Sequence, residues 1–331
     1  MPSTEPISYI SRPVSLATRR AGRLTGIGMS EGRAVPARYE VTHRTEYQYE
    51  TDVSDSYGQL HLLPRNLPRQ RCRQAEVLVD PIPDDYLERL DYFGNRVSYL
   101  AIHRPHRELT VTATSIIEVD DDGLDRQTDV GDQPWEQARD AIQQGRVPDP
   151  LDAAQYALDS PLVECSAAFA DYASTAFTPG RPLLDAAADL CDRIHTDFEY
   201  KSGSTSVTTP LAEIFAQRKG VCQDFAHVGI ACLRSIGLPA RYVSGYLETD
   251  PPPGRSKLKG ADRSHAWMSV LAPLTGWIDL DPTNNRLAND RYVVTAYGRD
   301  YGDVPPLSGV IYTVGKTESL RVFVDVVAIT D

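Results

Sequence analysis

A cysteine at the predicted start of a helix is the first residue of this sequence suited to covalent chemistry. Small and apolar residues recur after it at helical spacing, at Phe225, Val228, Gly229, Cys232 and Ile236. Gly237 and Pro239 then end the helix, which leaves Cys222 in its first turn, where the helix dipole favours a thiolate. The dipole contributes about 0.3–1 kcal/mol, less than the roughly 1.4 kcal/mol that one pH unit of pKa represents. A neighbouring imidazolium is therefore needed as well.

His265 is the candidate imidazole, and Asp281 is the candidate acid that orients it. Two β-strands are predicted around them, at 264–271 and 277–283. If these strands pair antiparallel about Pro273, His265 lies opposite Asp281, and the rival acid Asp279 lies opposite Trp267. We expect Asp281 to accept the Nδ1 proton of His265 and so to fix the tautomer that a nucleophile's base requires.

Four further residues are candidates for the wall of the site or for substrate contacts: Trp267, His227, Arg299 and Asp303. Each has a structural alternative. His227 follows Cys222 by five residues, about 140° round the helix, so a hydrogen-bonding role in the core is favoured over a second base. Trp267 either walls the site or only packs. Arg299 and Asp303 either line the cleft or close a salt-bridged turn.

A zinc site is the alternative use of the same residue types. Its ligands would be Cys222, His227, His265 and Asp281. The thiol at a helix start and the order Cys, His, Asp suit a nucleophile better, so we expect neither a metal nor a cofactor.

Composition excludes several classes of partner. The 331 residues carry a formal net charge of -12 and show no basic patch, which argues against nucleic-acid binding. No run approaches the roughly 20 apolar residues of a membrane span. The five cysteines are an odd number, are scattered, and form no CxxC pair. These features predict a protein of the reducing cytoplasm.

The pattern along the chain predicts an α+β protein in four parts. Residues 1–36, rich in Ser, Thr and Arg, are expected to be a flexible leader. Short alternating runs at 37–120, split by Pro, Asp and Gly, predict an antiparallel β-sandwich-like domain. A helical connecting region is expected at 121–180. A catalytic core with C-terminal strands is expected at 181–331, including a helix at 182–194.

Four ordered motifs resemble the bacterial transglutaminase-like family. They are Gly-Val-Cys-Gln-Asp-Phe-Ala-His at 220–227, Gly-Leu-Pro-Ala-Arg-Tyr-Val-Ser-Gly-Tyr at 237–246, Ser-His-Ala-Trp at 264–267 and Asp-Pro-Thr-Asn at 281–284. The segment at 298–309 and the N-terminal strands are also similar, so the resemblance covers about 37–330. It implies a papain-like core in which a helix bearing Cys222 packs on an antiparallel sheet bearing His265 and Asp281.

Two positions depart from the family pattern. Ser269 stands where many relatives carry Glu, and Tyr292 stands where His is common. Neither removes a member of the Cys-His-Asp set, but both could change the choice of substrate. The backbone N–H of Cys222 is the expected first oxyanion donor, and the sequence assigns no second one.

The function expected from these residues is cysteine-dependent acyl chemistry at an amide bond of a peptide or protein. Hydrolysis of a peptide or isopeptide is favoured, because the sequence has no calcium-loop signal like that of the animal crosslinking enzymes. One alternative is a protein-glutamine gamma-glutamyltransferase, which uses an amine as acceptor in place of water. The other is a binding or scaffold module that keeps the fold without turnover.

Overall fold

The computed structural model describes residues 36–120, 133–249 and 262–329. The predicted leader lies outside these residues apart from its last position, as does the first part of the connecting region, up to residue 132. The described residues within Ala34–Asp331 form one compact unit. Among the described residues, no helix is long and apolar enough to cross a membrane.

The predicted sandwich is present and consists of two antiparallel four-stranded sheets. One has the strand order β15-β1-β6-β3 and the other β14-β2-β5-β4. Their strands are β1 (Ala37–Val53), β2 (Asp55–Leu60), β3 (Gln70–Asp80), β4 (Asp85–Leu90), β5 (Arg96–Ile102), β6 (His106–Val119), β14 (Leu307–Tyr312) and β15 (Thr317–Ala328). Burial in β6 alternates with a period of two, which places Leu109, Val111 and Ala113 in the core between the sheets.

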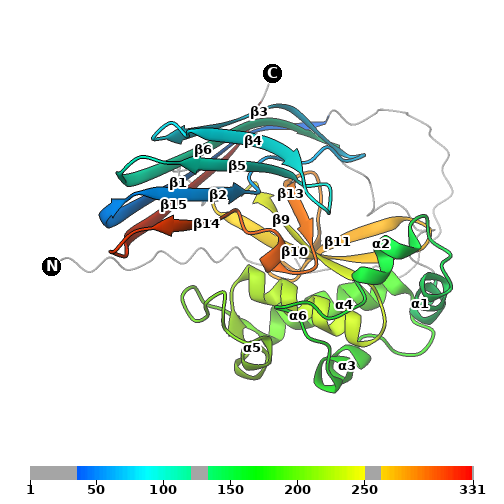
Figure 1. Ribbon diagram of the computed structural model, residues 1–331. Helices are drawn as coiled ribbons and strands as arrows, with labels where there is room; N and C mark the ends of the chain where they lie inside the picture. Colours follow the sequence, from blue (N-terminus) through cyan, green and yellow to red (C-terminus); the bar gives the residue numbers. More distant parts are fainter. Residues whose placement is uncertain (1–35, 121–132, 250–261, 330–331) are drawn as a thin grey trace, which may run out of the picture. The chain divides into compact units, whose positions relative to one another are not determined.

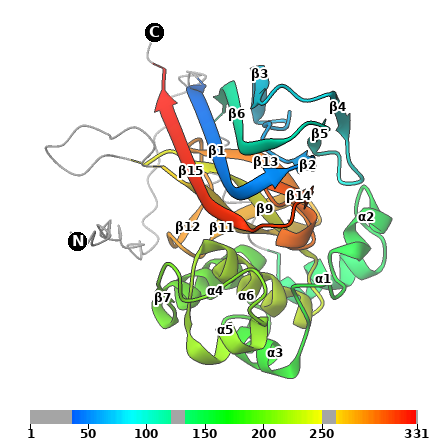
Figure 2. The ribbon, with the colours of Figure 1, turned by 60° about the vertical axis from the view of Figure 1, so that its left-hand side comes forward.

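The C-terminal strands differ from the sequence expectation, which grouped them with the catalytic core. β14 pairs with β2, and β15 pairs with β1 over most of its length, from Tyr39 opposite Ala328 to Tyr49 opposite Thr317. Figure 2 shows β15 running beside β1 at the edge of its sheet. The chain therefore returns to complete the N-terminal sandwich, because each sheet has an edge whose backbone groups need a partner.

Six α-helices and one 3₁₀ turn lie among the described residues from Trp135 onward. They are α1 (Trp135–Gln143), α2 (Pro150–Gln155), α3 (Ala167–Ser174), α4 (Leu183–Asp197), α5 (Leu211–Gln217), α6 (Cys222–Ser235) and η2 (Tyr301–Asp303). α6 begins at Cys222, as the apolar spacing predicts, and Gly237 follows its end with a positive φ.

A five-stranded antiparallel sheet forms the middle layer, in the order β12-β11-β10-β9-β13. Its strands are β9 (Ala240–Leu247), β10 (Ser264–Ala272), β11 (Gly276–Asp281), β12 (Arg286–Leu287) and β13 (Tyr292–Gly298). Helix α6 packs on β10 and β9, as Figure 1 shows. Gly229 permits this close packing, since a Cβ there would lie 2.2 Å from the Met268 sulfur.

The sandwich is hydrogen-bonded to strand β13 of the middle sheet. Gln70 donates through Nε2 to the Val294 carbonyl at 2.7 Å and accepts the Val294 N–H at 2.7 Å. Asn95 makes the same pair of bonds with the backbone of Tyr297, both at 2.8 Å. These buried amides hold the sandwich against the sheet that carries His265 and Asp281.

Candidate active site

The start of α6 is fixed by a short parallel strand pair. β7 (Glu199–Tyr200) pairs with β8 (Lys219–Gly220), and the N–H of Lys201 donates to the Gly220 carbonyl at 2.8 Å. The extended residue Val221 then leads directly into Cys222, the first residue of the helix. The thiol therefore lies at the positive end of a 14-residue helix, where a thiolate is stabilised.

Asp224 caps this helix start. Its Oδ2 accepts the Val221 N–H at 2.8 Å and the Thr205 hydroxyl at 2.6 Å. Through these bonds the Asp224 side chain caps the first turn of α6. Gly220 leaves room for them, because a Cβ at that position would lie 2.6 Å from Asp224 Oδ2.

His265 is the second residue of β10, and both Asp281 and Cys222 act on its imidazole. Its Nε2 donates to Asp281 Oδ2 at 2.7 Å. The expectation that Asp281 would take the Nδ1 proton is therefore wrong, and the acid holds the other ring nitrogen. Nδ1 does not bond to Asp281, and Cys222 is among the groups that raise the pKa of His265. The His265 side chain is 10% exposed and Cys222 is partly buried, so the pair borders solvent.

Asp281 is fully buried and saturated with hydrogen-bond donors. Besides His265, its Oδ2 accepts the Asn284 side-chain amide and the Tyr292 hydroxyl, each at 2.7 Å. Its Oδ1 accepts the backbone N–H groups of Thr283 and Asn284 at 2.8 and 3.2 Å. A carboxylate bound in this way stays ionised despite its burial, because each donor favours the charged form.

The pKa values of His265 and Asp281 move apart. Burial alone would lower the pKa of His265, but the Asp281 charge and the hydrogen bonds to Asp281 and Cys222 raise it. Burial alone would raise the pKa of Asp281, but the His265 charge and the bonds from His265, Asn284 and Tyr292 lower it. The geometry thus favours an imidazolium beside Cys222, as the chemistry of an activated thiol requires.

Strands β10 and β11 pair in a register two residues away from the expected one. The hairpin closes with Ala272 opposite Gly276. Asp279 therefore lies opposite Ser269 and not opposite Trp267, as the expected register would have it. Because side chains repeat every second residue, a two-residue slip leaves each one on its predicted face. His265 and Asp281 therefore still meet, as diagonal neighbours.

The Trp267 side chain packs against His265 and is not exposed to a substrate. Its side chain is fully buried and its ring stacks on the His265 ring, with centroids 6.0 Å apart. The indole N–H donates to Asp279 at 3.2 Å, and the ring meets the Tyr292 ring edge-on at 5.2 Å.

His227 has a partner in the core. It is buried, and its Nε2 accepts the Tyr301 N–H at 3.1 Å. Burial lowers its pKa to about 4, although the Asp300 charge acts in the opposite direction. The structural alternative therefore describes His227 better than the role of a second base.

Arg299 and Asp303 form the salt-bridged turn that the sequence left as an alternative. Arg299 donates to Asp303 through its backbone N–H, Nε and Nη2, at 2.8, 2.9 and 2.8 Å. The turn follows Gly298, which pairs with Tyr242, whereas His265 pairs with Gly245 three residues along the same strand. That offset corresponds to about 10 Å along β9.

Sequence reasoning did not assign the partners of Asp281. Asn284 stood in a quoted motif without a role, and Tyr292 was noted only as a departure from the family pattern. Both lie within 11 residues after Asp281 and bear a donor, but their convergence depends on the turn after β11. Helix α4 holds that turn, since His195 bonds through Nδ1 with the Thr283 carbonyl at 2.9 Å.

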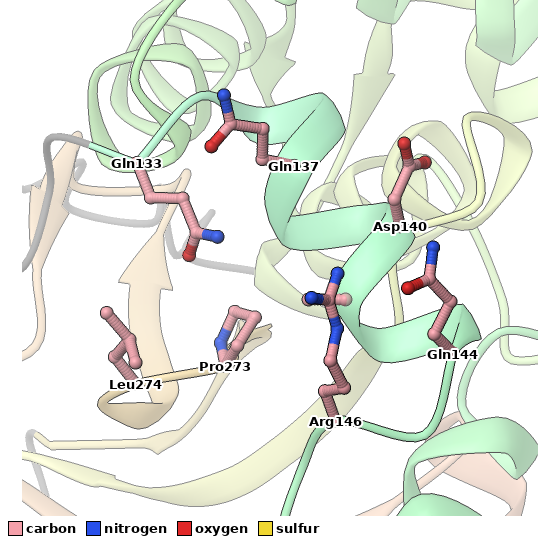
Figure 3. A pocket seen from close by; sticks show the side chains of 8 residues that line it. Gln133, Gln137, Asp140, Gln144, Arg146, Pro273 and Leu274 are labelled. Atoms are coloured by element: carbon pink, nitrogen blue, oxygen red, sulfur yellow. The ribbon is translucent and has the colours of Figure 1, made fainter.

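No metal-binding group is assembled in the described ranges, where three or more His, Cys, Asp or Glu side chains nowhere converge suitably. The alternative zinc set of four residues is therefore not brought together. A separate hollow lies between α1 and the β10–β11 turn, and Figure 3 shows its polar lining. It is lined by Gln133, Gln137, Asp140, Ala141, Gln144, Arg146, Pro273 and Leu274. Since His265 lies at the other end of β10, this hollow is not part of the candidate site.

Comparison with known proteins agrees with this architecture. Residues 39–118 match the bacterial transglutaminase-like N-terminal region, and residues 170–282 match the transglutaminase-like superfamily. An uncharacterized protein of Mycobacterium tuberculosis is 47% identical over 295 residues, covering 88% of this chain and 92% of that protein.

One solved structure and one shorter stretch of another protein's sequence are also similar to this chain. A protein of Cytophaga hutchinsonii, described as a candidate cysteine protease, has the same fold with a TM-score of 0.68 and 21% identity. The match covers 89% of this chain and 92% of that one. A protein-glutamine gamma-glutamyltransferase of Pseudomonas aeruginosa is 37% identical over 71 residues, which are 21% of this chain and 11% of that protein.

Proposed function

The chain belongs to the transglutaminase-like superfamily, and from this premise we propose that it is a cysteine enzyme acting on amide bonds of peptides or proteins. Cys222 is the nucleophile, His265 the general base and acid, and Asp281 the group that orients His265. One observation carries this proposal: the imidazole of His265 is hydrogen-bonded to the buried carboxylate of Asp281 at 2.7 Å, and Cys222 at the start of α6 raises the pKa of the same imidazole.

The reaction follows from the order of these three groups. The Cys222 thiolate attacks the amide carbonyl carbon, and the backbone N–H of Cys222 at the helix start can donate to the developing oxyanion. The carbon–nitrogen bond then breaks, and the His265 imidazolium gives its proton to the leaving amine. A thioester remains on Cys222, and His265, now neutral, can take a proton from the next nucleophile.

We favour water as that second nucleophile, which makes the protein a peptidase or amidase. The alternative acceptor is an amine, which would make it a crosslinking enzyme. The short match to a protein-glutamine gamma-glutamyltransferase supports that alternative only in the region of the core. All five cysteines are free thiols, in agreement with our proposal of a reducing, cytoplasmic setting.

The direct test is iodoacetamide alkylation as a function of pH, with each labelled cysteine identified by mass mapping. Rapid labelling of Cys222 near pH 6 is expected, because a neighbouring imidazolium stabilises a thiolate. The label should be slow in His265→Ala and absent in Cys222→Ser. Cys72 and Cys165 serve as internal controls, since burial raises the pKa of both thiols, that of Cys165 to about 11.

Two outcomes contradict the proposal. If Cys222 labels only above about pH 8 in the wild type, the ion pair is absent from the free protein. A binding or scaffold role then becomes the better description. If labelling near pH 6 persists in His265→Ala, another group activates the thiol. After a positive result, peptide substrates with and without added amines separate hydrolysis from transfer, because only transfer gives a product bearing the amine.

A further inference from the structure

Arg241 is a buried cation without a bonded partner in the described part of the chain. It stands on β9 and is only 8% exposed. Its guanidinium carbon lies 3.4 Å from the centroid of the Tyr297 ring and 4.2 Å from that of the Trp277 ring. The described residues offer it no hydrogen bond and no ion pair, and its Nε is a buried donor without an acceptor. The two ring faces offset part of the cost of burying this charge, but they do not replace the hydrogen bonds lost with water.

Ser269 lies beside Arg241 with a second unpaired donor. The two residues are directly opposite one another in the β9–β10 pair, so their side chains leave the sheet on the same face. Ser269 is fully buried, and its hydroxyl has no hydrogen-bond partner among the described residues. A guanidinium can only donate hydrogen bonds, and a serine hydroxyl can also donate one. Both groups lack an acceptor, and a ligand oxygen that bears negative charge would supply it.

A second guanidinium shares the Tyr297 ring. The Cζ atom of Arg65 lies 4.6 Å from the ring centroid. Arg65 donates through Nη1 to the Phe93 carbonyl at 2.9 Å and to Asn95 Oδ1, but no carboxylate of the described residues pairs with it. Burial lowers the pKa of Arg65, and the Arg241 charge acts in the same direction. Two cations therefore meet at one ring, and in the described ranges neither is bonded to a counter-charge, which favours an anionic ligand at this place.

Asp279 limits the charge that such a ligand can carry. It lies opposite Ser269 on β11, two strands from Arg241, and these two described residues form no ion pair. Its Oδ2 instead accepts the indole N–H of Trp267 at 3.2 Å. This acid repels a doubly charged phosphate more strongly than a singly charged carboxylate, and a planar carboxylate matches the guanidinium fork. Trp277 and Asp279 are partly exposed, so the row borders solvent on the β11 side.

We propose that Arg241 and Ser269 form a binding site for a small ligand that bears a singly charged carboxylate. The Arg241 guanidinium binds the two carboxylate oxygens, and the Ser269 hydroxyl donates to one of them. The site lies on the same face of β10 as His265 but four residues further along the strand, about 13 Å away. The fully buried Trp267 separates the two. The site is therefore distinct from the candidate active site, and its existence does not depend on the proposed reaction.

Acetate is the probe for this site, because it carries the carboxylate and little else. Saturation-transfer difference NMR of its methyl signal, at an ionic strength held constant with sodium chloride, measures its binding to the folded protein. Arg241→Met should raise the dissociation constant of acetate at least about tenfold, since hydrogen bonds to a charged group are lost. Arg299→Met is the matched control. It removes a guanidinium that already pairs with Asp303, and it should leave the dissociation constant unchanged.

Ser269→Glu provides a second test, which keeps the cation and decides the question if Arg241→Met does not fold. A glutamate opposite Arg241 would place its own carboxylate in the proposed site, so it should abolish acetate binding and raise the urea concentration of half-unfolding. Absence of an acetate signal in the wild type overturns the site, and so does a signal that persists in either variant. If phosphate displaces acetate at a lower concentration than formate does, the assignment of a carboxylate as the ligand is wrong.

Discussion

The imidazole of His265 and the buried carboxylate of Asp281 are joined by a 2.7 Å hydrogen bond although the two residues are not opposite one another in the sheet. His265 is the second residue of β10 and Asp281 the last residue of β11. Their contact is diagonal, across the open end of the hairpin. The arrangement leaves the second ring nitrogen free to meet Cys222 on a different element.

Asp281→Asn should remove most of the activation of Cys222. An amide cannot balance the imidazolium charge, so the fraction of protonated His265 at neutral pH should fall and alkylation of Cys222 near pH 6 should slow at least tenfold. Unfolding by urea should show a loss of about 3 kcal/mol, because a buried pair loses one partner. Asp279→Asn is the control, since that acid contacts Trp267 but not His265. Equal effects of the two substitutions would contradict a special role for Asp281.

Tyr292→Phe isolates one of the bonds to Asp281. Tyr292 donates to Asp281 at 2.7 Å from a buried position, and a hydrogen bond to a charged group contributes about 1.5–3 kcal/mol. We expect a stability loss in that range and a several-fold slower alkylation of Cys222 near pH 6. Tyr292→His, the residue common in the family, restores a donor at this position and should recover part of both losses. A Phe variant indistinguishable from the wild type would show that Asp281 does not need this donor.

The face of each site residue could be predicted from the sequence, but the register could not. Alternation with a period of two assigns Trp267 and Asp279 to faces without any knowledge of the turn. The register depends on the geometry of the loop. The hairpin closes at Gly276, whose φ of 82° suits a three-residue loop. The centre of that loop lies one position beyond Pro273, where the sequence placed it. The position of Cys222 was predictable because helix periodicity and the terminating glycine are local signals.

Long-range partnerships were beyond sequence reasoning. Nothing local to β15 indicates that it pairs with β1, more than 260 residues earlier in the chain. The donors of Asp281 raise the same difficulty, because Tyr292 reaches the carboxylate only after the chain has turned through β12.

The stability of the protein should depend on pH through His265. The folded protein raises the pKa of His265 above its ordinary value of 6.5, so above that pH the folded state retains a proton that the unfolded chain has lost. The stabilisation is complete below pH 6.5 and declines as pH rises through the alkaline range. Urea unfolding between pH 6 and 9 should show a larger decline for the wild type than for His265→Gln. His195→Gln, which removes only a bond to the Thr283 carbonyl, should keep the wild-type decline. Parallel curves for wild type and His265→Gln would refute the shift.

Ser269→Ala should leave the fold intact and stabilise it slightly. Ser269 is fully buried, and its hydroxyl has no hydrogen-bond partner in the described part of the chain. It lies opposite Arg241 on β9 and Asp279 on β11, neither of which bonds to it. Removing an unpaired buried hydroxyl relieves a desolvation cost, so we expect a gain of up to about 1 kcal/mol in the free energy of unfolding. A loss of more than about 1 kcal/mol would mean that the hydroxyl has a partner in solution.

Gly220→Ala should slow the alkylation of Cys222 indirectly, by displacing the Asp224 cap at the start of α6. The added Cβ would lie 2.6 Å from Asp224 Oδ2 and 2.7 Å from the Asp224 Cβ, so the capping carboxylate must move away from the Val221 N–H. Loss of a cap costs about 1 kcal/mol, and crowding in a packed site adds about 1–3 kcal/mol. We expect a lower free energy of unfolding in urea together with slower alkylation of Cys222 near pH 6, because the first turn of α6 carries the thiol.

The double variant Gly220→Ala with Asp224→Ala tests the cause of that loss. If crowding between the two side chains is responsible, removing the carboxylate relieves it, and the double variant should be more stable than the sum of the single losses predicts. The excess over additivity should reach about 1 kcal/mol. Strict additivity in a double-mutant cycle would mean that Gly220 is required for a reason other than the room it gives Asp224. In that case Cys222 alkylation would be expected to remain slow in the double variant as well.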